Sequence, residues 1–146
     1  MILPALAYAQ NNQGNGGPGF NPGIPNGTYI FNITGLIPVA PGGSPFPVAA
    51  VIRDTYTPDA TGSGGTTSAV ASYSIATTPV TLFTGVPVTG TFTVNADGSL
   101  TEIYYQHGPP FQTLHFISYP SPDATYIGIL ETDPGTVASG VGTRGR

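Results

Sequence analysis

The stretch Gly90–Gln106, GTFTVNADGSLTEIYYQ, constrains the fold of this chain more than any other segment. On both sides of Asp97-Gly98, large apolar residues alternate with polar ones, which is typical of half-buried strands. Asp-Gly can supply the positive φ angles that a two-residue type I′ turn requires. The segment therefore predicts a β-hairpin that turns at these two residues.

The length of the turn decides which side chains share a face of this hairpin. A two-residue turn pairs Phe92 with Ile103 and stacks both with Val94 and Tyr105 on one face. A three-residue loop would instead set Phe92 opposite Glu102, which is less favourable if that face belongs to a core. The pattern therefore favours the two-residue turn, with Glu102 on the outer face.

The rest of the chain repeats the same kind of signal. Short runs with period-two alternation are bounded by Gly, Pro, Asn and Asp, and no window shows helical spacing over three turns. The apolar middle of the second run predicts burial on both faces. Seven or eight strands at this spacing indicate an all-β fold, a small antiparallel β-barrel or a sandwich. Outside the hairpin, the predicted strands cover residues 28–34, 46–56, 66–76, 111–119, 124–132 and 136–143, and a short run at 80–83 is a candidate for one more.

The N-terminal part differs from the rest and predicts three divisions of the chain. Residues 1–9 end in Ala-Tyr-Ala before Gln10, small residues at the positions a signal peptidase recognises, so they are interpreted as the remnant of a signal peptide. Residues 10–27 are rich in Gly, Asn and Pro and predict a flexible leader. Residues 28–146 then form one barrel domain. This interpretation favours a secreted or periplasmic location; an N-terminal strand or a disordered tail is the alternative for residues 1–9.

Composition excludes several classes of partner. The 146 residues contain no lysine and three arginines, so no basic surface is available for nucleic acid or for an anionic membrane surface. The apolar run near the N-terminus is shorter than the roughly 20 residues of a membrane-spanning helix, and no integral membrane segment is predicted. Because cysteine is absent, disulfides, thiolate metal sites and cysteine nucleophiles are excluded. The few charges leave little electrostatic protection against self-association.

Four segments carry a resemblance to a known family: NGTYIFNITG (26–35), FPVAAV (46–51), TGTFTVNADGS (89–99) and ILETDPGTVASG (129–140). They resemble a family of secreted bacterial domains of the allene oxide cyclase type, which are small antiparallel barrels related in shape to lipocalins and dirigent proteins. The resemblance covers about residues 26–144 and implies a barrel and bacterial export. Its motifs are strand starts and turns, so it brings no catalytic residue to this chain. The loop at 57–65 is longer than the family's usual Asp-Gly turn.

The two histidines, His107 and His115, do not predict a metal site. Zinc needs three or four ligands within mutual reach, and cysteine is absent. A turn histidine beside Gly-Pro-Pro and a partly buried strand histidine are favoured instead. No cofactor is predicted, since no phosphate-binding loop, dinucleotide fingerprint or nucleophile elbow occurs in the chain.

The seven acidic residues divide into turn residues and strand residues. Four follow turn patterns in which aspartate caps the backbone: Asp59, Asp97, Asp123 and Asp133. The strand acids are Asp54, Glu102 and Glu131. Asp54 cannot pair with Arg53 across one face, because neighbouring strand residues point to opposite sides. We interpret Glu102 and Glu131 as outer-face residues.

Aromatic residues supply the candidate lining of the barrel interior. An eight-stranded barrel is either filled by its own side chains or holds one small ligand. The tentative ligand-binding residues are Tyr29, Phe31, Phe92, Tyr105 and His115. Packing of these residues in a solid core is the favoured alternative.

Three functions follow from these observations. The preferred one is an exported barrel with a structural, self-assembling or surface-interaction role, whose partners are further copies or an extracellular matrix. The second is a binding barrel for a small apolar ligand, which requires a cavity of roughly several hundred Å³. The third is an isomerase or cyclase, which requires Glu102, His115 or Tyr104 to point inward beside a pocket. Enzymatic activity stays open, and its absence is favoured.

Overall fold

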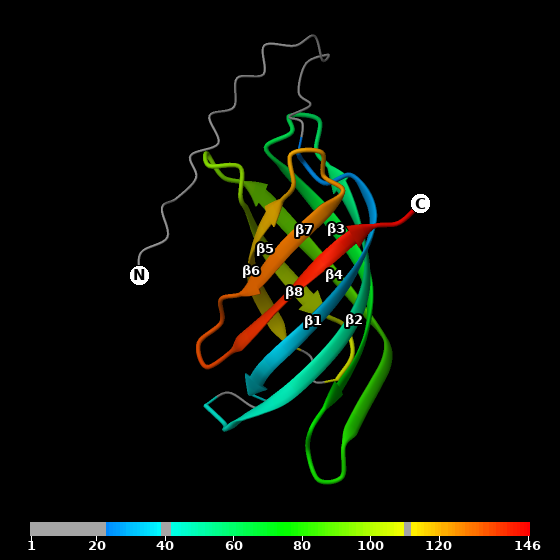
Figure 1. The fold of residues 1–146 in the computed structure, drawn as a ribbon, viewed down its shortest axis with the longest axis vertical. Coiled ribbons are helices and arrows are strands. Elements are labelled where there is room, and N and C mark those ends of the chain that lie inside the picture. Colours follow the sequence, from blue (N-terminus) through cyan, green and yellow to red (C-terminus); the bar gives the residue numbers. More distant parts are fainter. Residues whose placement is uncertain (1–22, 39–41, 110–111) are drawn as a thin grey trace.

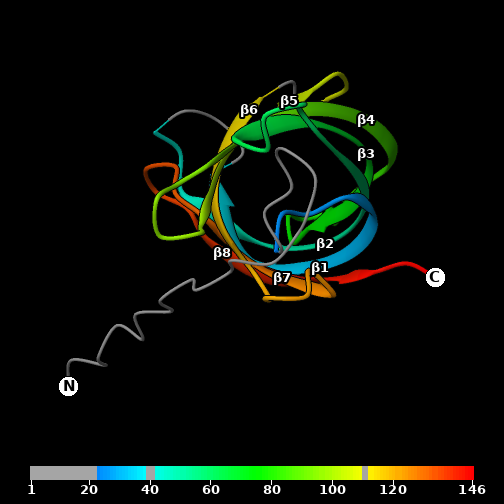
Figure 2. The same cartoon turned by 90° about the horizontal axis from the view of Figure 1, so that it is seen from above.

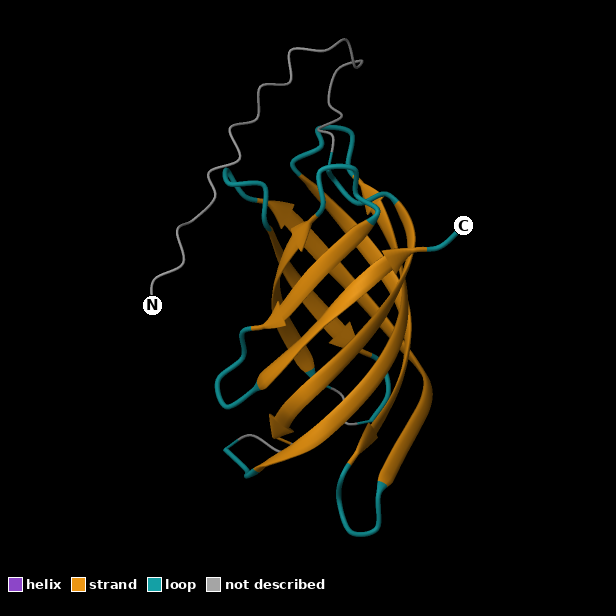
Figure 3. Cartoon of the chain, in the orientation of Figure 1, coloured by secondary structure: helices purple, strands orange, loops and turns teal. Residues whose placement is uncertain are grey.

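The structure is a computed structural model that describes residues 23–38, 42–109 and 112–146, and all regular elements within these ranges are β-strands (Figures 1 and 3). The predicted signal-peptide remnant and residues 10–22 of the predicted leader lie outside the described residues. No helix in the described ranges could cross a membrane. The strands are β1 (Gly27–Pro38), β2 (Pro45–Pro58), β3 (Gly64–Ile75), β4 (Thr81–Val94), β5 (Leu100–Gln106), β6 (Thr113–Pro120), β7 (Tyr126–Glu131) and β8 (Val137–Arg144).

The strands form one closed antiparallel barrel. Each strand pairs with the next along the chain, and β1 pairs with β8 to complete the ring. Seen from above, the strands surround a single interior (Figure 2). The predicted all-β class and the small antiparallel barrel are therefore confirmed, with eight strands.

Alternation along each strand builds the core of the barrel. On β1, the side chains of Tyr29, Phe31 and Ile33 are buried, whereas Ile30 and Asn32 face outward. Every strand repeats this pattern, because successive side chains point to opposite faces. Most buried side chains are apolar, and their removal from water is the main force that favours the closed state.

The β4–β5 hairpin corrects the predicted register. Phe92 pairs with Glu102, and a backbone hydrogen bond of 2.8 Å from Asn95 N to Ser99 O closes a three-residue loop at 96–98. Gly98, with φ of 84°, supplies the left-handed residue that ends such a loop. Asp-Gly is compatible with both turns, and the preference against an inward Glu102 led to the wrong one.

Two other strand predictions were wrong. The predicted short strand at 80–83 and the first strand of the hairpin are one strand, β4, which bends beside a register shift between Ala71 and Tyr73 and at Gly85. The second predicted strand is buried on one face only, since Val51 is 53% exposed. Each strand of a closed barrel has one face in contact with solvent.

The described part of the predicted leader packs against the barrel. Ile24 and Pro25 are buried, and Gly23 approaches Pro122 on the β6–β7 connection. Tyr29 donates a buried hydrogen bond of 2.6 Å to Ala124 O on the same connection. The packed domain therefore begins before residue 28, the predicted boundary.

Candidate functional site inside the barrel

Two acids and two tyrosines form a hydrogen-bonded group in the barrel interior. We call Asp54, Tyr56, Glu102 and Tyr104 the acid–tyrosine quartet. The Tyr104 hydroxyl lies 2.8 Å from Asp54 Oδ2 and 3.0 Å from Glu102 Oε2. The Tyr56 hydroxyl lies 2.9 Å from Glu102 Oε1 and 3.0 Å from the Tyr104 hydroxyl. Tyr104 therefore connects the two carboxyl groups.

Strand geometry explains why these residues meet. Asp54 and Tyr56 are two residues apart on β2, and Glu102 and Tyr104 are two residues apart on β5. Each pair therefore points to one face of its strand, and closure of the barrel turns both faces inward. Aromatic rings hold the phenols in place: Phe92 lies 5.5 Å from the Tyr56 ring, and Phe116 lies 5.6 Å from the Tyr104 ring, between centroids.

Burial sets the protonation of the quartet. Asp54 is 1% exposed and Glu102 is 0% exposed. Burial raises the pKa of Asp54 to about 6, although the hydrogen bond from Tyr104 acts in the opposite direction. Burial likewise raises the pKa of Glu102 to about 7, against the hydrogen bonds from Tyr56 and Tyr104. Both carboxyl groups therefore change protonation near neutral pH.

Basic groups do not compensate these acids. All three arginines and both histidines are exposed. Burial also raises the pKa of the Tyr56 and Tyr104 phenols well above the ordinary value, so both stay protonated and can donate. The interior thus contains acidic groups whose charge no cation within the described residues neutralises.

A small cavity adjoins the quartet. Its volume is about 40 Å³, enough for roughly two or three water molecules. Apolar side chains such as Phe31, Phe116 and Ile129 form most of its wall, and its polar lining consists of Asp54, Tyr104 and Gln106. The volume is about a tenth of the several hundred Å³ that a typical ligand pocket requires. The interior is therefore largely filled by side chains.

Five buried polar side-chain atoms lack a hydrogen-bond partner among the described residues. Asp54 Oδ1 and Gln106 Oε1 belong to residues of the cavity wall. Buried polar atoms without partners are rare, and each needs an explanation such as a bound molecule. Thr67 Oγ1, Ser118 Oγ and Glu131 Oε1 are the other three such atoms. Of the two unpartnered atoms on residues of the cavity wall, Asp54 Oδ1 is the acidic one.

Glu131 is a further buried acid, which corrects the prediction that Glu131 and Glu102 are outer-face residues. Glu131 is 7% exposed at the end of β7, and it pairs with Phe116 in the sheet. Burial, followed by the nearby charge of Asp133, raises the pKa of Glu131 to about 7. Three acids therefore point into the barrel: Asp54, Glu102 and Glu131.

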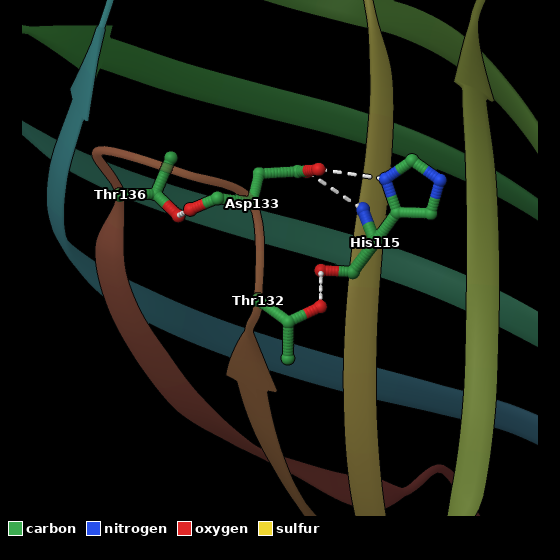
Figure 4. Close-up of polar contacts among 4 residues, drawn as sticks. All are labelled: His115, Thr132, Asp133 and Thr136. Carbon is green, nitrogen blue, oxygen red and sulfur yellow. Dashed lines mark hydrogen bonds and ion pairs between the residues drawn. The ribbon is translucent and has the colours of Figure 1, made fainter.

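His115 lies outside the barrel, where it contacts Asp133 (Figure 4). Its Nδ1 atom lies 2.6 Å from Asp133 Oδ1, and its backbone N–H donates to Asp133 Oδ2 at 2.8 Å. Thr132 Oγ1 donates to His115 O at 3.2 Å. These contacts join β6 to the β7–β8 connection. No three acids or histidines gather as a metal site in the ranges that the structure covers.

The tentative lining residues divide into two groups. Tyr29, Phe31 and Phe92 are buried in the interior, and Phe31 lines the cavity. Tyr105 is 45% exposed and His115 is exposed, so both are corrected to outer-surface residues. The three-residue loop explains the position of Tyr105, because a change of one residue in register exchanges the two faces of β5.

The turn aspartates behave largely as predicted. Asp59, Asp97 and Asp123 each accept hydrogen bonds from residues two positions later, and these bonds lower the pKa of each carboxyl. Asp133 differs from the prediction, since its carboxylate binds His115 and the turn bonds from Thr136 go to its backbone oxygen. Arg53 and Asp54 point to opposite faces, as predicted. The other histidine, His107, lies on the surface, with its Nε2 2.7 Å from Thr89 Oγ1.

A repeated sequence pattern could have found the quartet. Asp54-Thr-Tyr56 and Glu102-Ile-Tyr104 both consist of an acid, one intervening residue and a tyrosine, and they lie on two different strands.

Comparisons with protein-family models, with curated proteins and with solved structures gave no match. The resemblance to allene oxide cyclase-type barrels stays a prediction, and the functional argument rests on the geometry of the quartet and its cavity.

Proposed function

We propose that the barrel binds a small, mostly apolar molecule beside Asp54 and moves a proton on it, as an isomerase does. The observation that carries this proposal is the acid–tyrosine quartet at the wall of an apolar cavity. Buried acids without a cation destabilise a fold, and apolar residues would fill the same space at lower cost. Residues that break the rules of core packing in this way are often functional.

The chemistry of the site supports proton transfer in particular. Asp54 Oδ1 is the free oxygen that would exchange a proton with the bound molecule. Acids with pKa values near neutral pH can both accept and donate protons at moderate cost. Two carboxyl groups with a phenol between them are an arrangement suited to shifting a proton beside a carbonyl group. The cavity is small, so the molecule must be small or must displace side chains such as Phe31 and Phe116.

The proposal predicts that the protein isomerises allyl methyl ketone, a small β,γ-unsaturated ketone, to its conjugated form. Proton NMR would follow the conversion near neutral pH. We expect Asp54→Asn to slow the reaction roughly a hundredfold, which is a typical contribution of a general base. Asp133→Asn, which removes a carboxylate outside the barrel, is the matched control and should retain the wild-type rate. Equal rates for wild type and Asp54→Asn would overturn the proposal.

A different surface supports a self-associating barrel as a second candidate. The outward residues of β1, β7 and β8 include no charged side chain between Thr28 and Leu36, between Tyr126 and Leu130, or between Val137 and Thr143. Several large apolar side chains are exposed on this side and the adjoining strands: Ile30, Leu36, Val51, Tyr119, Tyr126, Leu130, Val137 and Val141. Extended apolar surfaces of this kind are frequent at protein–protein interfaces.

This second candidate predicts that the protein forms oligomers at high concentration. Sedimentation velocity should show a species larger than the monomer, and Val141→Glu should shift it toward the monomer. Val80→Glu, at an exposed position outside this surface, should leave the distribution unchanged. A wild-type protein that stays monomeric at high concentration would exclude the role.

A further inference from the structure

We propose that Asp54, Tyr104 and Glu102 form a proton wire. Asp54 contacts the bound molecule, Tyr104 passes a proton between the two carboxyl groups, and Glu102 holds that proton. This inference rests on the proposed function and deepens it. Glu102 is fully buried and is not part of the cavity wall, so it cannot touch a molecule in the cavity. Its connection to the cavity runs through the hydroxyl of Tyr104.

The number of available protons supports a shared proton. Four contacts join the quartet: Tyr104 to Asp54, Tyr104 to Glu102, Tyr56 to Glu102, and Tyr56 to Tyr104. Each contact needs a proton between its two oxygens. With both carboxyls ionised, the two phenols supply only two protons. Two additional protons on the carboxyl groups would satisfy all four contacts, and one additional proton satisfies all except the contact between Tyr56 and Tyr104.

The same geometry accommodates the shared proton at either end. In one state, Asp54 carries it on Oδ2 and donates to the Tyr104 oxygen. Tyr104 and Tyr56 then each donate to one oxygen of an ionised Glu102. In the other state, Glu102 carries the proton on Oε2 and donates to Tyr104, which donates to Asp54 Oδ2. Only the positions of protons differ between these states, since the heavy-atom distances of 2.8 and 3.0 Å suit both directions.

A transfer through the wire is balanced. When Asp54 Oδ1 takes a proton from the bound molecule, the Oδ2–H bond breaks and its proton passes to the Tyr104 oxygen. The Tyr104 O–H bond breaks in turn, and its proton forms a bond to Glu102 Oε2. The electron pair of the broken C–H bond stays on the molecule, so no oxidant or reductant is needed. The reverse sequence returns the proton at another atom and restores the ionised Glu102.

The groups that face the wire favour a proton shared between Asp54 and Glu102 over a proton localised on one of them. On β1, Tyr29 packs edge-on to Tyr56 at 5.5 Å between centroids. On β7, Glu131 lies beyond Phe116, and β6 contributes Ser118 and Phe116. No arginine or histidine of the described ranges lies in the interior to hold a negative charge at one end. Burial raises the pKa of both carboxyls toward similar values, about 6 and about 7.

Carbon-13 NMR of the ligand-free protein tests the wire. In wild type, we expect the first deprotonation step between about pH 5 and about pH 8 to appear at the carboxyl carbons of both Asp54 and Glu102. Tyr104→Phe should confine this step to one of the two carbons. Tyr56→Phe is the matched control, because it removes a phenol but leaves the Asp54–Tyr104–Glu102 chain intact, so both carbons should still report the step.

A second measurement needs no variant. The Cζ carbon of Tyr104 in the wild-type protein should shift with the same midpoint as the two carboxyl carbons. Three results would each overturn the wire. The deprotonation step could appear at only one carboxyl carbon in wild type, or it could still appear at both carboxyl carbons in Tyr104→Phe. The third is a Tyr104 Cζ carbon whose chemical shift does not change with pH. Since no ligand is used, these results are independent of the ketone assay: a failed wire leaves the isomerase proposal standing, and an inactive protein with a shared proton would reject only the proposed reaction.

Discussion

Deprotonation of Asp54 and Glu102 as the pH rises from about 5 to about 8 is expected to lower the free energy of unfolding by on the order of 4 kcal/mol. The pKa of Glu102 is raised from 4.5 to about 7, and that of Asp54 from 3.8 to about 6. Between the unfolded and folded values, the folded state binds more protons than the unfolded state. Stability is therefore greatest while both carboxyls are protonated and falls as the pH rises to about 7.

Urea unfolding at several pH values checks this expectation. The double variant Asp54→Asn, Glu102→Gln should be more stable than wild type at about pH 8 and should lose the larger part of the pH dependence between these limits. The remaining dependence should come from Glu131, whose pKa is also raised by burial. The turn aspartates contribute with the opposite sign, because their pKa values are lowered. Their effect appears only below about pH 4, outside this window.

A wild-type protein with constant stability from about pH 5 to about pH 8 would contradict the burial of the two acids. The usual barrel core is apolar, and the stability of a barrel with such a core depends little on pH between about 5 and about 8. The pH profile therefore reports directly on the feature that distinguishes this interior. The double variant does not change the His115–Asp133 contact on the surface. The difference between its pH profile and that of wild type therefore reports on Asp54 and Glu102.

The fold could be predicted from the sequence because it depends on a repeated local signal. Alternation in segments such as Thr28–Thr34 gives the strand class without knowledge of any partner. Strand ends were less certain: Gly85, which interrupts the apolar pattern, lies inside β4 because the strand bends there instead of ending. A local pattern cannot distinguish a bend from a turn when both use glycine.

The site could not be predicted to the same extent, because its residues meet only when the barrel closes. Asp54-Thr-Tyr56 and Glu102-Ile-Tyr104 are distant in the chain and lie on strands that are not paired with each other. The register at Asp97-Gly98 decides whether Glu102 faces inward, and a rule against buried acids selected the wrong register. The predicted isomerase requires Glu102, His115 or Tyr104 to point inward. Glu102 and Tyr104 are buried in the interior, whereas His115 is exposed.

The seam between β1 and β8 gives the second large effect. Gly140→Ala is expected to destabilise the protein by about 3 kcal/mol, because overpacking of a close contact forces the backbone to move. A Cβ atom at this position would overlap the backbone oxygen of Asn32 and lie 2.9 Å from the Cα of Ile33. Backbone atoms on the paired strand cannot rotate away as a flexible side chain can.

Gly128→Ala is the matched control for this seam. Gly128 lies on β7, and the nearest atom to its added Cβ would be Tyr119 O at 4.0 Å, so the substitution should change stability little. Urea unfolding of both variants measures the difference. The quartet sits inside a ring that only the β1–β8 contact closes, so Gly140→Ala should also admit water and shift the carboxyl titrations toward their ordinary values. Equal stability of the two variants would mean that the seam tolerates a side chain, and that closure of the barrel does not depend on this glycine.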